Sequence, residues 1–281
     1  MSQDKPAYQL FDGNGKKIKY KKILKLLKEA DVIFFGELHN NPIAHWLQLE
    51  VLQDLTQTMG SAQLVVGAEM YETHQQAGLD KFLAGEINVK ELEEQEQLWP
   101  NHDTDYRPVL EFCESKKIPV VATNIPRKYA RTVAFEGGVT ALDSLPADEK
   151  ALMVPLSFDI DYELPSYAAM RDMMGGHAGS KMSADNFIAA QAIKDATMAH
   201  FLLKNLPEGK KFYHLNGSYH SDSKEGIAWY VKQARPDLTI VNLTVVEQKD
   251  ISELEEENEE KADIVIVVPA TMTKTYRSGF E

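Results

Sequence analysis

Two short segments of the sequence repeat a Gly-x-x-His spacing directly after an apolar run: GELH (36–39) and NGSYH (216–220). In GELH, Glu37 stands two residues before His39, so in an extended chain both side chains point to the same side. A carboxylate and an imidazole placed in this way can bind a divalent metal ion, or act as a base and an acid. A surface loop that starts a helix is the plainer interpretation. The functional interpretation is favoured, because burial of a charge directly after an apolar strand is costly unless the charge has a role.

The segment AEMYE (68–72) places a second glutamate, Glu69, directly after another apolar run. A buried carboxylate is expensive unless it is paired or bound. Tyr71 and His74 follow it and are candidate ligand contacts, although each also suits the start of a helix. Glu69 therefore joins Glu37 and the two Gly-x-x-His histidines, His39 and His220, as a candidate centre.

The segment TNIPR (123–127) carries a cation at the predicted start of a helix. We expect Pro126 in the first turn of that helix and Asn124 as its cap. Arg127 then lies where the helix dipole disfavours a positive charge. Either an anionic ligand holds it, or it forms a structural ion pair with Glu37 or Glu69.

Other polar residues leave two interpretations open. Tyr219 is either a hard oxygen ligand for ferric iron or a wall residue. Asp195 interrupts an apolar stripe, so it either faces the pocket or is exposed. Four histidines have no motif around them, and for each of these packing is the more frequent role: His45, His102, His177 and His214.

The elements that position these residues follow one repeated order: an apolar run, a polar segment and then a helix. The apolar runs cover 32–35, 64–66, 118–122 and 212–215, and two further runs at 238–246 and 264–268 close the chain. This alternation predicts an α/β fold with a mainly parallel central sheet flanked by helices. Ligands bind such sheets outside the carboxyl ends of the strands. The four polar segments should therefore converge on one pocket.

The remaining segments complete a single predicted α/β domain over residues 1–281. Residues 8–20 predict a β-hairpin around the turn at 12–15, and an amphipathic helix follows. The stretches 86–112 and 141–205 predict a helical cap over the strand ends. Part of this cap is rich in methionines that are candidates either for an apolar slot or for helix core: Met170, Met173, Met174 and Met182.

Composition limits the partners and the compartment. The 281 residues carry a formal net charge of −13, which disfavours nucleic acid and anionic membranes as partners. The single cysteine, Cys113, rules out an internal disulfide framework and is expected to be buried. No apolar window has the length of a membrane span, and no signal peptide is visible. The chain is then either cytoplasmic or an exported protein whose signal has been removed.

Taken together, these segments and the helix AQAIKDATMA (190–199) resemble the ChaN-like haem-binding proteins. These are iron-regulated bacterial envelope proteins in the wider superfamily of the Tiki proteases, TraB and the erythromycin esterases. The resemblance runs from about residue 30 to about residue 232. It implies haem as the cofactor, a location in the bacterial cell envelope and a homodimer that holds two haems face to face. It also implies a role in iron uptake, with an outer-membrane uptake system as a partner.

The resemblance implies a tyrosine as the axial ligand of haem iron, without fixing which one. Tyr71, Tyr167 and Tyr219 are the candidates. Further candidate cofactor contacts are Arg127, Asn124 and His177. In the Tiki branch, the corresponding histidines and glutamates form a metal-dependent hydrolase centre, and this pattern is matched by Glu37, His39, Glu69 and His220. A divalent-metal hydrolase is therefore the alternative function, and a buried polar network without activity is the third.

Overall fold

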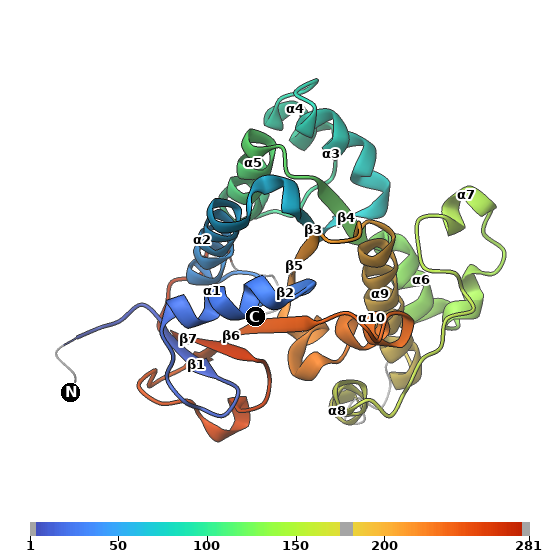
Figure 1. Ribbon diagram of the computed structural model, residues 1–281. Coiled ribbons are helices and arrows are strands. Elements are labelled where there is room, and N and C mark those ends of the chain that lie inside the picture. Colours follow the sequence, from blue (N-terminus) through green and yellow to red (C-terminus); the bar gives the residue numbers. More distant parts are fainter. Residues whose placement is uncertain (1–3, 175–181, 277–281) are drawn as a thin grey trace.

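A single seven-stranded sheet forms the centre of the computed structural model, which describes residues 4–174 and 182–276 (Figure 1). The strands are β1 (Gln9–Asp12), β2 (Val32–Glu37), β3 (Leu64–Glu72), β4 (Val120–Asn124), β5 (Lys211–Gly217), β6 (Ile240–Gln248) and β7 (Ile264–Pro269). Their order across the sheet is β1-β7-β6-β2-β5-β3-β4. Only the β1–β7 pair is antiparallel; the other pairs are parallel, as the alternation of apolar runs and helices predicts.

Strand β2 shows why helices must cover both faces of the sheet. Ile33 and Phe35 belong to the core on one face, and Val32 and Phe34 belong to the core on the other. All four side chains have no exposed surface. A continuous apolar run of this kind is typical of a parallel strand that is buried on both sides.

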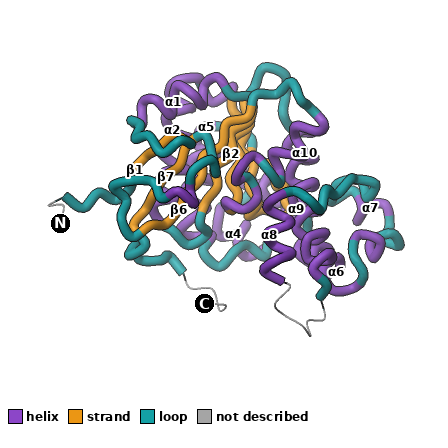
Figure 2. The backbone as a smooth tube through the Cα atoms, turned by 90° about the horizontal axis from the view of Figure 1, so that it is seen from below, coloured by secondary structure: helices purple, strands orange, loops and turns teal. Residues whose placement is uncertain are grey.

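The helices divide between the two faces (Figures 1 and 2). The first group supplies the larger core and consists of α1 (Tyr20–Glu29), α2 (Pro42–Met59), α3 (Gln76–Leu83), α4 (Val89–Gln95) and α5 (Arg107–Lys116). The second group consists of α6 (Arg127–Glu136), α7 (Ala147–Lys150), α8 (Pro165–Met174), α9 (Ala184–Lys204) and α10 (Ile227–Ala234). Helix α9 is the centre of this group, because it packs against α6, α8, α10 and β4.

The predicted N-terminal hairpin is present as a short antiparallel contact, and its first arm also joins the central sheet. Strand β1 pairs with β7 at the edge of the sheet, and the second arm of the turn keeps a single bridge between Phe11 and Lys17. A two-stranded hairpin alone is only marginally stable in water. Strand β1 gains stability because it lies beside β7, which supplies four apolar residues in register with it. Cys113 is buried, as expected.

The stretches of the predicted cap have two kinds of environment. Val109 and Leu110 of α5 pack in the core beneath the sheet, so this part of 86–112 is a layer of the fold. Met170 of α8 and Phe187 of α9 line a cavity at the strand ends. That residues 141–205 form a cap over the strand ends therefore remains a prediction. Within the described residues, no helix combines the length and apolar character that a membrane crossing requires.

Candidate functional site

The main cavity of about 610 Å³ lies where β2, β3, β4 and β5 end, and all four polar segments line it. The parallel pairing of β2 with β5 places Glu37 beside Gly217, which brings GELH and NGSYH together. Strand β5 also pairs with β3, and β3 pairs with β4. The predicted convergence at the carboxyl ends of the strands is thus present in the structure.

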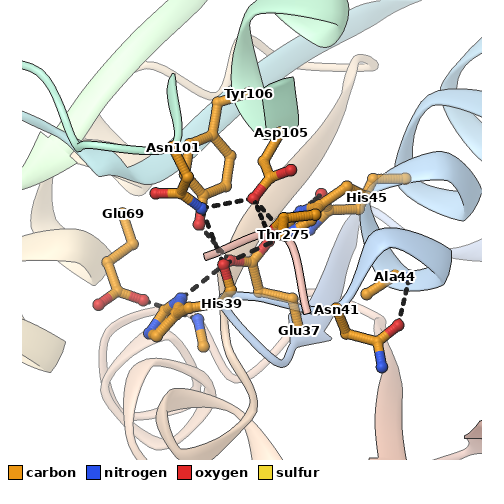
Figure 3. Close-up of polar contacts among 12 residues, drawn as sticks. Glu37, His39, Asn41, Ala44, His45, Glu69, Asn101, Asp105, Tyr106 and Thr275 are labelled. Carbon is orange, nitrogen blue, oxygen red and sulfur yellow. Dashed lines mark hydrogen bonds and ion pairs between the residues drawn. The ribbon is translucent and has the colours of Figure 1, made fainter. Parts of the chain in front are cut away.

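Glu37 is the centre of a buried hydrogen-bond network (Figure 3). His39 Nδ1 lies 2.8 Å from Glu37 Oε1, and the Tyr106 hydroxyl donates to the same oxygen at 2.8 Å. Gln48 Nε2 donates to Oε2 at 2.5 Å, and His45 Nδ1 lies 3.4 Å from that oxygen. Burial opposes ionisation, but the charge of His45 and the bond from His39 outweigh it and hold the pKa of Glu37 well below its usual range.

The imidazole of His45 links this network to a second carboxylate. Its Nε2 lies 3.4 Å from Asp105 Oδ2, which also accepts a hydrogen bond from Thr275 Oγ1 at 2.6 Å. Burial alone would lower the pKa of His45, but the charge of Glu37 dominates and raises it to about 9. The backbone N–H of Thr275 also donates a hydrogen bond to the backbone oxygen of Asn40. The segment after β7 therefore contacts both the GELH loop and the carboxylate of Asp105, which lies beside His45.

Glu69 lies beside this first network and belongs to a second. Its Oε2 accepts the backbone N–H of Gly217 at 2.7 Å, and its Oε1 lies 3.3 Å from His220 Nε2. Burial opposes ionisation of this carboxylate, but the charge and hydrogen bond of His220 hold its pKa well below the usual range. A Cβ on Gly217 would meet His39 Nε2 at 2.8 Å and Glu69 Oε2 at 3.5 Å, so His39 faces the second network across this glycine.

Asp195 completes the second network. Its Oδ1 lies 2.5 Å from His220 Nδ1, and its Oδ2 accepts a hydrogen bond from the Tyr167 hydroxyl at 2.7 Å. Burial disfavours the charged imidazole, but Glu69 and Asp195 together raise the pKa of His220 to about 10. Each ring nitrogen of His220 therefore contacts a carboxylate.

The three candidate tyrosines have different surroundings. The Tyr71 hydroxyl is buried and lies 3.0 Å from His102 Nε2. Tyr167 is buried and bonded to Asp195. Tyr219 is 67% exposed, lines the main cavity, and its hydroxyl has no hydrogen-bond partner among the described residues.

The expectations for TNIPR need correction. Asn124 is the last residue of β4, Pro126 is the N-cap, and the helix begins at Arg127, so Asn124 does not cap it. Instead, Asn124 Nδ2 donates to the backbone oxygen of Glu69, while its buried Oδ1 has no partner in the described part of the chain. The alternative of an ion pair from Arg127 to Glu37 or Glu69 is wrong, because both carboxylates pair with histidines. Arg127 is exposed and lines the cavity.

Sequence reasoning missed several contributors to the site. Trp99 lines the cavity and packs edge-on against His39, with ring centroids 4.9 Å apart. His45, expected only to pack, also holds Glu37, and Asp195 is buried. Of the four cap methionines, Met170 and Met173 line the cavity, and Met182 is partly buried and packs against the core between α6 and α9. The Met174 side chain and His177 lie outside the described residues.

The four residues predicted to bind a metal ion are present as two carboxylate–imidazole pairs. Among residues 4–174 and 182–276, no three His, Cys, Asp or Glu side chains are grouped in a way that suits one metal ion. A metal ion would have to displace a proton from His220, whose pKa is raised to about 10. The metal assignment for these residues remains a prediction.

A sequence model of the haem-binding uptake proteins of the Tiki superfamily, ChaN, matches residues 23–231. The chain belongs to this ChaN family. A structure described as cofacial heme binding to ChaN of Campylobacter jejuni has a TM-score of 0.71 and 20% identity, over 94% of this chain and 97% of that one.

Two further proteins are similar to this chain. An erythromycin esterase, EreC in its open conformation, has a TM-score of 0.54 and 10% identity over 98% of this chain and 100% of the other. Both structural matches show a shared fold. The protein RETICULATA-RELATED 5, chloroplastic, of Arabidopsis thaliana is 23% identical in an alignment over 199 residues that covers 67% of this chain. The matched stretch spans only 26% of the length of that plant protein.

Proposed function

We propose that this ChaN-family protein binds haem in the main cavity, with the Tyr219 phenolate oxygen as the axial ligand of ferric iron. The state of the three tyrosines is the observation that carries this proposal. The hydroxyls of Tyr71 and Tyr167 are buried and engaged, whereas that of Tyr219 is exposed at the cavity. A tyrosine oxygen is an established axial ligand of haem iron in proteins.

The lining of the cavity suits a large, flat, apolar group with charged edges. Trp99, Ile125, Met170 and Phe187 contribute apolar walls. Such walls favour burial of a porphyrin face and keep water from the iron. When bound, haem supplies the iron and its redox chemistry. The chain's own residues orient the group, and His39 lines the same cavity.

A titration with hemin tests the proposal. Wild-type protein should shift the Soret band and reach saturation at a fixed stoichiometry with micromolar hemin. An unchanged Soret band over this range, in protein whose far-UV circular dichroism shows it to be folded, would remove the proposal.

The same proposal extends to haem uptake in a bacterial cell envelope by a homodimer. Met173 is 59% exposed and lies with Tyr219 on the lining of the main cavity. A second copy placed over this opening would bury both side chains and shield two haems from water. Light scattering with and without hemin tests it: a mass that doubles on hemin addition supports the dimer, and a constant monomer mass contradicts it.

A divalent-metal hydrolase remains the second candidate function, because His39 and His220 both contact carboxylates and both line one cavity. In this role Glu37, His39, Glu69 and His220 would hold a metal ion, which would supply an activated water. Affinity for the ion should rise steeply with pH, because protons must leave the histidines. Elemental analysis after re-metallation tests it. Equal metal content in wild type and His39→Ala would contradict this role.

A further inference from the structure

Residues 270–276 follow β7 and lie against the loop that carries His39. In the sheet, β6 separates β7 from β2, so this segment passes the end of β6 to reach that loop. The backbone N–H of Thr275 donates to the backbone oxygen of Asn40 at 2.9 Å. Asn40 Nδ2 donates in turn to the backbone oxygen of Tyr276 at 3.3 Å. The residue next to His39 is therefore held through both its backbone and its side chain.

Asn41, the following residue, is joined to the same segment through Glu247. Asn41 Nδ2 donates to Glu247 Oε1 at 3.0 Å, and the same oxygen pairs with Lys274. Asn41 Oδ1 accepts the backbone N–H groups of Ile43 and Ala44 and so caps α2. The loop between β2 and α2 is thus fixed at its helical end as well.

The hydroxyl of Thr275 completes a buried cluster around Asp105 (Figure 3). Asp105 Oδ2 accepts hydrogen bonds from the Thr275 hydroxyl and from Asn101 Nδ2, each at 2.6 Å. The same oxygen lies 3.4 Å from His45 Nε2. The Asn101 and His45 nitrogens also lie 2.8 Å and 3.3 Å from the backbone oxygen of His39. Asp105 and His39 thus share two partners, and Thr275 adds a donor that the buried carboxylate needs.

Polar contacts, and not apolar burial, decide where residues 270–276 lie. Each of these seven residues is at least partly exposed. A segment of this kind can open locally while the rest of the protein stays folded. Loss of one of its hydrogen bonds should therefore act mainly on its neighbour, the loop that carries His39.

We propose that Thr275 is a positioning residue for His39. Its hydroxyl acts through Asp105, and its backbone N–H acts through Asn40. Together they hold the backbone of His39, and with it the imidazole that lines the main cavity. The consequence for ligand binding rests on the proposed function, because His39 meets haem only if haem occupies that cavity. The positioning itself is independent of haem.

NMR of the ligand-free protein tests the positioning. Thr275→Val keeps the shape of the side chain but lacks the hydroxyl, so the ring resonances of His39 should shift. The backbone N–H of Asn41, which closes the turn of the loop, should exchange with solvent about tenfold faster. Thr275→Ser restores the hydroxyl and should resemble wild type in both respects. His200, on α9, is the internal reference. Unchanged His39 resonances in Thr275→Val, or equal shifts at His39 and His200, would overturn the proposal, because a general loss of stability does not single out His39.

A hemin titration tests the consequence for the cavity. Thr275→Val should bind hemin about fivefold more weakly than wild type, and Thr275→Ser should bind it equally well. Thr273→Val removes the hydroxyl of an exposed residue on the same segment and should match wild type. Equal affinity of wild type and Thr275→Val would overturn the role in ligand binding. If wild type binds no hemin, the proposed function fails, and the NMR comparison alone decides the positioning.

Discussion

Nδ1 of His220 lies 2.5 Å from Oδ1 of Asp195, a residue 25 positions earlier in the chain. The contact joins the segment after β5 to the middle of helix α9, and both side chains are buried. Because Glu69 holds the opposite nitrogen, the ring of His220 is fixed from two sides. Asp195 therefore acts on the cavity through His220, as a positioning residue.

Replacement of Asp195 by Asn should weaken this hydrogen-bond network without removing all of its contacts. The amide oxygen still accepts a hydrogen bond, but the negative charge beside the imidazolium is lost. We expect unfolding free energy to fall by about 2 kcal/mol and the pKa of His220 to fall from its raised value. Urea denaturation and histidine NMR titration measure the two effects. Asp185→Asn on the same helix, with a 70% exposed side chain, is the control and should change neither.

The raised pKa of His220 predicts a specific dependence of stability on pH. The folded protein holds this proton more tightly than the unfolded chain, where the pKa is 6.5. Its stabilising contribution is complete below about pH 6.5 and is lost as the pH rises through about 10. The difference in unfolding free energy between wild type and His220→Gln should therefore shrink by about 4 kcal/mol between pH 6 and pH 10. A difference that stays constant over this range would contradict the assignment.

Substitution of Gly217 by Ala should displace His39. The backbone at this position (φ −58°, ψ 141°) accepts alanine, so strain does not arise from the main chain. The added Cβ would lie 2.8 Å from Cε1 and Nε2 of His39, which must swing away from Glu37. We expect a loss of about 1–3 kcal/mol in unfolding free energy. In a His39→Ala background the same substitution should cost much less, and an equal cost in both backgrounds would refute the clash.

Much of the fold follows from local pattern. The run 32–35 is apolar at every position, which predicts a strand buried on both faces, and β2 is such a strand. The parallel arrangement then places the four polar segments at one edge of the sheet. The pairing of β1 was not predictable in the same way, because its partner β7 lies about 250 residues later and no local signal links them.

The site was predictable only in part. Glu37, His39, Glu69 and His220 lie in polar segments that directly follow apolar runs of the sequence, and this position alone marks them. The pairing of each histidine with its carboxylate depends on distances across the sheet, which the spacing of residues along the sequence does not reveal. The role of Asp195 depends on the rotation of α9 about its axis, which an apolar stripe with one polar interruption leaves open.

The most direct test of haem ligation by Tyr219 is the spectrum of hemin-loaded wild type beside three variants. Resonance Raman excitation should reveal a phenolate–iron bond in wild type, and Tyr219→Phe should lose it together with about tenfold in hemin affinity. Tyr71→Phe and Tyr167→Phe should keep both, since their hydroxyls are engaged within the protein. A phenolate signature that persists in Tyr219→Phe would contradict the account.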